Sequence, residues 1–265
     1  MTDGRALARE FLEQQRLLGG SSLILGNVDA VPSADGRMGG SADREGTNPS
    51  AEPPIRPSAD LPSPGVSFEP PARDFFIADP LSQAADLAAI ATLIAACEKC
   101  RLCEGRSRTV PGEGAATARL MVVGEGPGRV EDETGRPFVG PAGELLTKIL
   151  AAIELPRQQV YICNIVKCRP PENRQPQYDE IAACIPFLYR QIELVKPAVI
   201  LAMGNTAAQS LLGTKQSLGA LRNRVHRFRG IPVIVTYHPA ALLRNPNWKR
   251  PTWDDVRIAR RLLDG

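Results

Sequence analysis

The chain has 265 residues, a formal net charge of +3 and six cysteines. Its length allows one or two domains, and so small a charge does not by itself indicate a nucleic-acid partner. No apolar run approaches the roughly 18 to 20 residues that span a bilayer, and the N-terminus is charged where a signal peptide would be apolar. We therefore expect a cytoplasmic protein with no membrane association, whose cysteines are metal ligands, catalytic groups or buried small residues rather than disulfides.

The N-terminal third differs in composition from the rest of the chain. Residues 6–18 have the apolar spacing of a short amphipathic helix, which two glycines end. Residues 30–80 hold ten of the 24 prolines and few aliphatic residues, so they cannot bury enough apolar surface to offset the entropy lost on ordering. We predict that residues 1–82 form this helix and a disordered linker, and that residues 83–265 form the folded domain.

Strand and helix patterns alternate from residue 81 onward. Short β-branched runs predict buried strands, and longer segments with apolar residues on one side predict helices. The expected strands are 120–123, 160–166, 198–203 and 231–237, the last with a hairpin partner at 225–228. The expected helices are 81–96, 143–153, 178–195, 205–212 and 253–263. This alternation predicts an α/β fold with a central, mostly parallel four-stranded sheet flanked by helices.

The first strand runs directly into a glycine-rich stretch, VGEGPGRVEDETGRPFVG. Gly124, Gly126 and Gly128 allow a ligand to approach the main chain closely. Three carboxylates follow, and then Phe138, which we expect to be exposed. By itself the stretch is weak evidence for a site, because glycine-rich turns are common and the spacing is neither GxGxxG nor a Walker loop.

Polar residues also follow the other predicted strands. Asn164 ends the second strand, Gly204 and Asn205 follow the third, and His238 follows the fourth. In open α/β sheets, ligands bind beyond the carboxyl ends of the strands. We therefore expect groups that are distant in the sequence to meet at one rim of the sheet.

The cysteines suggest a metal centre. A close group is followed by two cysteines in later segments: Cys97, Cys100 and Cys103, then Cys168 and Cys184. A zinc ribbon would need a second close CxxC pair, which this sequence lacks. Four thiolates from distant segments suit an iron–sulfur cluster at least as well. Cys103 is either a ligand or a bystander, and Cys163, within an apolar strand pattern, is expected to be a buried small residue.

Four motifs resemble the family 4 uracil-DNA glycosylases in their order and spacing: CEKCRLCEGRSRTVPGEG, VGEGPGRVEDETGRPFVGPAG, NIVKCRPPENRQP and YHPAALLRNP. The likeness extends over about residues 85–265 and leaves out the N-terminal third. It implies a hydrolase of DNA repair that cleaves the N-glycosidic bond of uracil and leaves an abasic site. It also implies a [4Fe–4S] cluster held by Cys97, Cys100, Cys168 and Cys184.

The chemistry of uracil removal gives two of the motif residues a role. A base inside a duplex must be flipped out before an enzyme can reach it. Phe138 is then the expected stacking platform for the flipped ring. The amide of Asn164 has both a donor and an acceptor, so it can face uracil O4 and N3–H together, whereas cytosine presents the reverse pattern.

Bond cleavage builds negative charge on the departing uracil, and His238 is expected to hydrogen-bond its O2 atom. A carboxylate is needed to position water and to offset the positive charge on the sugar. Family 1 enzymes have an aspartate where this chain has Gly126, so the acid must come from elsewhere. Glu131 is our first candidate, with Glu125 and Asp132 behind it. Gly128 replaces the bulky residue that excludes the thymine methyl group in family 1.

The expected partner is uracil-containing DNA, single- or double-stranded. Lys167 and Arg244 are expected to contact phosphates, and Leu242, with its neighbour Leu243, to press into the gap left by the flipped base. Residues 167–184 contain neither the histidine nor the inserted loop of a covalent uracil-trapping relative, so we predict turnover. We expect a monomer whose N-terminal segment is a candidate docking site for replication or repair proteins.

Two alternatives differ from this interpretation. One is a non-catalytic iron–sulfur module that binds DNA or a partner protein. The other is a glycosylase that prefers another deaminated base, such as hypoxanthine or xanthine. Retention of Phe138, Asn164 and His238 together argues against the first alternative, because binding alone would not need all three.

Overall fold

The computed structural model describes residues 79–265. The predicted N-terminal helix and nearly all of the proline-rich linker lie outside the described residues, and the domain boundary at residues 82 and 83 stays a prediction. Within residues 79–265, no helix combines the length and the apolar character needed to cross a bilayer.

A six-stranded sheet forms the centre of the described part, in the order β1-β3-β2-β4-β6-β5. The strands are β1 (Glu113–Gly114), β2 (Leu120–Gly124), β3 (Tyr161–Asn164), β4 (Val199–Met203), β5 (Val225–Phe228) and β6 (Ile231–Thr236). The four central strands are parallel, and β1 and β5 pair with the sheet in antiparallel fashion at its two edges. The predicted α/β class and the four parallel strands are confirmed.

The central strands are apolar because helices cover both of their faces. Every residue of β2, β3 and β4 is buried. Met121 and Val123 belong to the main apolar core, together with Ile90, Leu188 and Ala208 from three helices on the same side of the sheet. Continuous burial of short β-branched runs is the physical reason why these strands are readable from the sequence.

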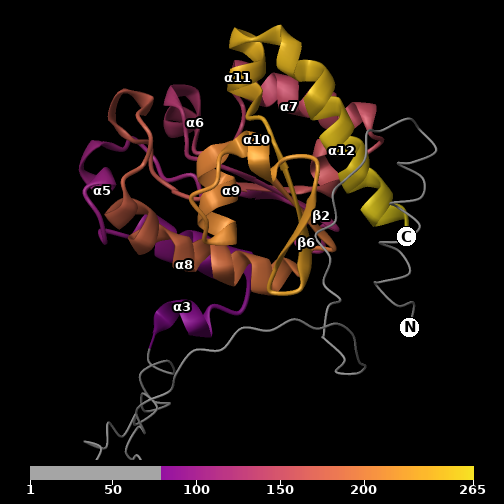
Figure 1. The fold of residues 1–265 in the computed structure, drawn as a ribbon. Helices are drawn as coiled ribbons and strands as arrows, with labels where there is room; N and C mark the ends of the chain where they lie inside the picture. The colour runs from indigo at the N-terminus through magenta and orange to yellow at the C-terminus, as the bar shows by residue number, and fades with distance from the viewer. Residues whose placement is uncertain (1–78) are drawn as a thin grey trace, which may run out of the picture. The chain divides into compact units, whose positions relative to one another are not determined.

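The helices form the two outer layers (Figure 1). They are α3 (Pro80–Gln83), α4 (Leu87–Ala95), α5 (Leu102–Gly105), α6 (Arg129–Thr134), α7 (Pro141–Ala152), α8 (Tyr178–Val195), α9 (Asn205–Leu212), α10 (Leu218–Leu221), α11 (Pro239–Arg244) and α12 (Lys249–Asp264). Three 3-10 turns are η1 (Arg157–Gln159), η2 (Pro171–Asn173) and η3 (Pro246–Trp248). In Figure 1, α8 runs below the sheet, whereas α7 and α12 lie above it. The long C-terminal helix α12 packs on β4 and β6.

Three differences from the predicted elements have local causes. The helix predicted at 81–96 is divided into α3 and α4, because Asp86 caps the second helix by accepting a hydrogen bond from the Ala89 amide. Helix α12 begins at Lys249 rather than residue 253, since Pro251 is tolerated in a first turn, where its missing N–H costs nothing. The segment Glu113–Gly114, which was not among the expected strands, pairs with β3 as an edge strand.

Candidate functional site

A cavity of about 650 Å³ opens at the carboxyl ends of the parallel strands. All four central strands contribute to it, as the open-sheet rule predicts. The loop after β2 supplies Glu125, Gly126, Pro127 and Gly128; β3 supplies Asn164; the turn after β4 supplies Gly204 and Asn205; and the segment after β6 supplies Tyr237 and His238. Phe138 and Glu131 also line the cavity.

Phe138 and Asn164 meet over Gly124, the last residue of β2. A Cβ atom at Gly124 would lie 2.5 Å from the Phe138 ring and would also overlap the Asn164 side-chain oxygen. Glycine is therefore required here because two side chains of the cavity occupy its space. Phe138 is 5% exposed, which corrects the expectation of an exposed aromatic residue: its ring belongs to the cavity wall.

Asn164 is held by its position in the sheet. It ends β3 beside Gly124 of β2, and its side chain is 1% exposed. Its Oδ1 atom is buried and has no hydrogen-bond partner among the described residues. A buried acceptor without a partner is costly, so this atom is available for a donor that enters the cavity.

His238 and Phe138 both line the cavity and their rings contact each other, with the two ring centroids 5.3 Å apart. It is the N-cap of α11, where its Nδ1 atom accepts a hydrogen bond from the Ala240 amide at 3.2 Å. The proton of the neutral ring must then lie on Nε2, which becomes a donor. Burial, followed by the nearby charge of Arg244, lowers the pKa of His238 to about 4. The imidazole is therefore neutral at physiological pH.

Asp132 accepts hydrogen bonds from the Ser107 amide on both oxygens and does not line the cavity, whereas Glu131 and Glu125 do. Glu131 Oε1 accepts hydrogen bonds from the Val139 and Gly140 amides, both at 2.9 Å. Its Oε2 atom lies next to Gly128, where an added Cβ would come within 2.9 Å of it. Glycine at position 128 thus leaves room for the carboxylate. Glu125 instead accepts a 2.5 Å hydrogen bond from the Thr206 hydroxyl.

Two aromatic residues of the cavity were not predicted from the sequence. Tyr237 and Trp248 stack in parallel, with centroids 4.7 Å apart and planes at 4°. The Arg222 guanidinium lies 4.3 Å from the Tyr237 ring centroid, and both aromatic residues line the cavity. Tyr237 directly precedes His238 at the predicted strand end, and that position was the available signal. Trp248 comes from η3, which no periodic pattern marks.

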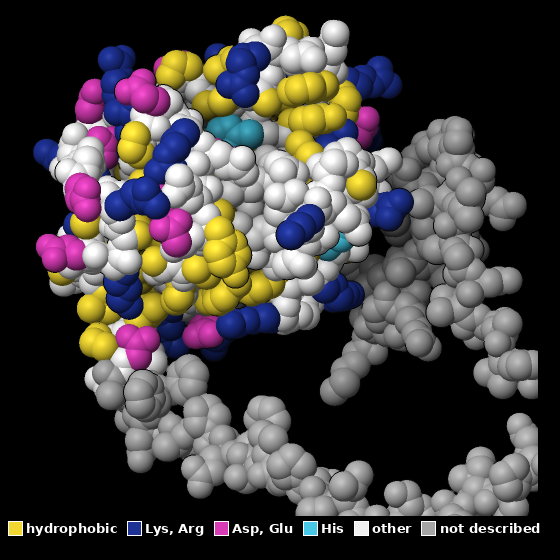
Figure 2. Space-filling view, turned by 60° about the vertical axis from the view of Figure 1, so that its left-hand side comes forward, with side chains coloured by type: hydrophobic (Ala, Val, Ile, Leu, Met, Phe, Trp, Pro, Cys, Tyr) yellow, Lys and Arg dark blue, Asp and Glu magenta, His cyan; other side chains and the backbone are white. Residues whose placement is uncertain are grey.

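Two of the predicted DNA contacts require correction. Lys167 is 1% exposed, so it cannot reach a phosphate, and Leu242 is also 1% exposed and packs in the core. The sequence does not distinguish which leucine of the pair faces solvent, and the structure exposes Leu243 by 50%. Arg244 is exposed and lines the cavity rim, so its position allows the predicted contact. On the face drawn in Figure 2, basic side chains are scattered among acidic ones rather than gathered into one strip.

Five cysteines line a second, small cavity beside α4, α5 and α8: Cys97, Cys100, Cys103, Cys168 and Cys184. The four predicted ligands therefore come together from distant segments, and Cys103 joins them. Cys163 is fully buried in β3 and does not line this cavity. Among residues 79–265, no three histidine, cysteine or acidic side chains form the tight group that would hold a single metal ion.

The surroundings of these thiols fit an anionic cluster. Burial raises the pKa of Cys168 and Cys184, whereas Arg106 and Lys167, respectively, act in the opposite direction. The Arg106 guanidinium lies 3.4 Å from Cys168 Sγ. The buried Lys167 amine donates only to neutral acceptors, the Asn164 carbonyl and the Gln191 side chain, both at 2.7 Å. Buried cations need anions nearby, and a sulfur-only ligand set beside them suits an iron–sulfur cluster.

Comparison with known proteins identifies the family of the chain. Residues 111–258 match the family model of the uracil DNA glycosylase superfamily, so the chain belongs to that superfamily. It is 46% identical to the type-4 uracil-DNA glycosylase of Pyrobaculum aerophilum over 169 residues, which are 61% of this chain and 86% of that protein. It is also 46% identical to the Thermotoga maritima type-4 enzyme over 171 residues, 63% of this chain and 89% of the relative.

A type-5 uracil-DNA glycosylase of Pyrobaculum aerophilum is more distant, at 34% identity over 155 residues, 51% of this chain and 67% of that protein. The chain is thus a member of the type-4 uracil-DNA glycosylase family. The resemblance inferred from the four motifs is confirmed.

Proposed function

We propose that this chain removes uracil from DNA by hydrolysis of the N-glycosidic bond and leaves an abasic site. The observation that carries the proposal is the placement of three side chains around one cavity. The Phe138 ring, the Asn164 amide and the His238 imidazole come from separate segments, and all three line it. Together they offer a flipped pyrimidine a stacking surface, an edge to pair with and a donor for its second carbonyl.

Asn164 is proposed to select uracil. Its unpartnered Oδ1 atom can accept the N3–H of uracil, and its amide N–H groups can donate to O4. Cytosine would place its N4 donors against the amide donors and its N3 acceptor against Oδ1. Mispairing of buried polar groups is strongly penalised, so the amide discriminates between the two bases.

His238 is proposed to stabilise the departing base. Its neutral imidazole, with the proton on Nε2, can donate a hydrogen bond to uracil O2 while negative charge develops there. Because the main-chain amide of Ala240 holds Nδ1, the donor is oriented before the substrate arrives. A preorganised donor does not have to reorient as the bond breaks.

Glu131 is proposed to position the attacking water through Oε2, since Oε1 is occupied by the loop amides. Glu131→Gln keeps an oxygen for those amides and removes the negative charge. We expect this variant to fold normally and to lose most single-turnover excision. An unchanged single-turnover rate would exclude Glu131, and the same test on Glu125→Gln would then identify the second candidate.

A [4Fe–4S] cluster is proposed at Cys97, Cys100, Cys168 and Cys184, where Lys167 and Arg106 would balance its charge. When bound, the cluster would supply a structural cross-link between the segments that carry these thiolates. Cys103 lines the same cavity and is proposed as a bystander. Iron and sulfide analysis of Cys103→Ser against Cys184→Ser would separate a bystander from a ligand.

Arg244 is proposed to contact a DNA phosphate near the cavity. Leu243, rather than Leu242, is proposed to enter the gap that the flipped base leaves in the base stack. Leu243 is half exposed and lies beside Arg244. Action as a monomer and a partner for the N-terminal segment stay predictions.

The proposal is tested with the purified holoprotein and a matched set of oligonucleotides that carry uracil, thymine, hypoxanthine or xanthine at one position. Each is offered single- and double-stranded, and alkali then reveals abasic sites. We expect cleavage at uracil and none at thymine. Binding without cleavage would support the non-catalytic module, and faster cleavage at hypoxanthine or xanthine would support the alternative base preference.

A further inference from the structure

Phe138 has a backbone conformation that is unfavourable for a residue with a side chain. Its φ angle is 50°, in the left-handed region where Cβ approaches the neighbouring carbonyl. Such a residue keeps this conformation only when its surroundings over-determine it. The groups that hold this backbone therefore decide where the ring lies in the cavity.

Close packing on two sides restrains the Phe138 backbone in part. A Cβ atom at Gly124 would touch the Phe138 ring, and one at Gly143, in the first turn of α7, would overlap the Phe138 carbonyl. Packing limits the space that the residue can occupy. It does not supply a directional bond to the peptide groups that define its φ and ψ angles.

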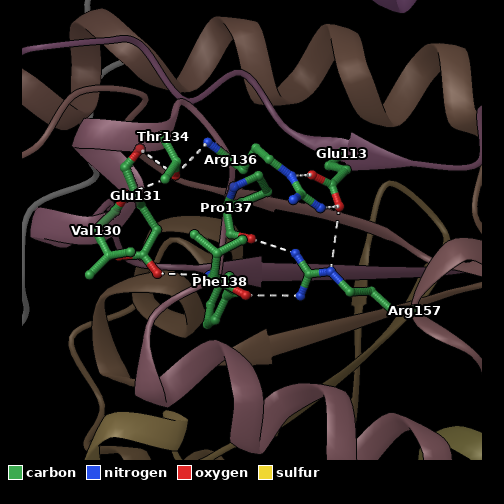
Figure 3. A network of polar contacts seen from close by, with 9 residues as sticks. Glu113, Val130, Glu131, Thr134, Arg136, Pro137, Phe138 and Arg157 are labelled. Atoms are coloured by element: carbon green, nitrogen blue, oxygen red, sulfur yellow. Dashed lines mark hydrogen bonds and ion pairs between the residues drawn. The ribbon is translucent and has the colours of Figure 1, made fainter.

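Arg157 supplies these bonds (Figure 3). It lies in η1, before β3, and its side chain is only 13% exposed. Its Nη1 atom donates to the Phe138 carbonyl at 2.9 Å, and its Nη2 atom donates to the Pro137 carbonyl at 2.5 Å. The planar guanidinium thus hydrogen-bonds the carbonyls of two successive peptide groups, which fixes their relative orientation.

The guanidinium is in turn oriented by Glu113 of the edge strand β1. Its Nε atom faces Glu113 Oε1 at 3.5 Å, and the same carboxylate forms a two-bond ion pair with Arg136, with the Nε to Oε2 distance 2.7 Å. Arg136 is 61% exposed, and its guanidinium bonds go to Glu113 rather than to the Phe138 peptide groups. Glu113 therefore pairs with two arginines. Arg157 is largely buried and reaches the cavity wall at Phe138, whereas Arg136 is exposed and does not reach it.

We infer that Arg157 is a positioning residue of this glycosylase, which fixes the Phe138 ring for stacking on the flipped base. The inference rests on the proposed stacking role of Phe138. Without the guanidinium, the Phe138 backbone loses the hydrogen bonds that hold its two flanking peptide groups in the left-handed conformation, and the ring loses its orientation relative to His238. The Glu131 bonds to the next two amides are then the remaining polar restraint on the loop.

The experiment compares Arg157→Met with Arg157→Lys and with Arg136→Met. Arg136→Met is the matched control, because Arg136 is the other arginine that pairs with Glu113. The full-length holoprotein is used, and iron content and thermal unfolding are measured first. Base flipping is followed by the fluorescence of 2-aminopurine next to uracil, and excision by single-turnover kinetics. We expect Arg157→Met to lower both the flipping amplitude and the excision rate by about tenfold or more, the scale of one lost charge-assisted hydrogen bond.

The controls distinguish positioning from general stability. Arg136→Met should stay within about twofold of the wild type, because exposed ion pairs contribute little. Arg157→Lys, which can donate to one carbonyl, should recover part of the excision rate. If Arg157→Met fails to fold, Arg157→Lys alone tests the inference. A single-turnover excision rate of Arg157→Lys equal to that of Arg136→Met then overturns it.

Phe138→Ala separates this inference from the function on which it rests. We expect it to lose flipping and excision at least as strongly as Arg157→Met. If Phe138→Ala excises uracil like the wild type, the stacking role itself is wrong. If Phe138→Ala is impaired while Arg157→Met matches Arg136→Met, stacking stands and only the positioning role of Arg157 is overturned.

Discussion

At the scale of single residues, the chemistry of His238 depends on one main-chain amide. The Ala240 N–H occupies Nδ1 and leaves Nε2 as the donor toward the cavity. Burial keeps the ring neutral, because the charged form is poorly solvated there. Sequence position identified the histidine, but neither its tautomer nor its protonation state follows from the sequence.

The first prediction concerns pH. The pKa of His238 is lowered to about 4, below the value of about 6.5 of an unfolded histidine. Between these values the unfolded chain binds more protons, so the His238 contribution to the free energy of unfolding falls as the pH falls and is fully present above about 6.5. We expect proton NMR of His226→Gln, which retains one histidine, to show no titration near pH 6.5. A midpoint at that pH would contradict the lowered pKa of His238.

The second prediction concerns Asn164. Asn164→Ala leaves two polar groups of uracil unpaired, at about 1–3 kcal/mol each, which corresponds to a fall in kcat/KM between about 30-fold and about 10⁴-fold. Steady-state kinetics on uracil-containing DNA measure the effect. Asn164→Asp serves as the control for shape, since its carboxylate accepts from N3–H but has no donor for O4. If both variants excise uracil normally, Asn164 does not read the base.

At the scale of secondary structure, the end of β3 joins the two candidate sites. Asn164 lines the large cavity, and Lys167 and Cys168, three and four residues later, line the cysteine cavity. The Lys167 amine hydrogen-bonds the Asn164 carbonyl, and the Lys167 amide donates to Cys184 Sγ at 3.3 Å. This short segment therefore connects the proposed cluster to Asn164, the residue proposed to read the base.

The third prediction follows from that connection. Lys167→Met removes a buried cation beside the thiols and the hydrogen bond to Asn164, so we expect lower iron content, a lower unfolding temperature and weaker excision. Lys148→Met makes the same substitution on an exposed face of α7 and should change none of these quantities. Iron and sulfide analysis with thermal unfolding checks both variants. Equal iron content in the two would show that Lys167 does not support the cluster.

At the scale of the whole molecule, the described residues contain every group assigned to the two candidate sites. The sheet collects four strand ends at one rim, and helices cover both of its faces. The type-4 relatives match this chain over most of their own length while covering about 60% of it. The family model matches residues 111–258, so residues 1–78 lie outside the matched part.

The fourth prediction tests that division. A chain that begins at Asp79 should fold, bind iron and excise uracil from oligonucleotides within about twofold of the full-length rate, because no group of either site is removed. Unfolding temperature, iron content and single-turnover kinetics are the measurements. A truncated protein that folds but has lost most of its excision activity would place a catalytic or DNA-binding role in residues 1–78.

The sequence by itself determined the fold class, the parallel strands and the family. Buried strands need continuous apolar runs, and the motifs lie at the strand ends where open sheets bind ligands. Only the tertiary structure decided which residues face which way. It buries Lys167, Leu242 and Phe138, exposes Leu243, and brings Arg157 to the Phe138 carbonyl. The reason is physical: burial and hydrogen-bond partners depend on segments far apart in the chain, and local periodicity carries no information about those contacts.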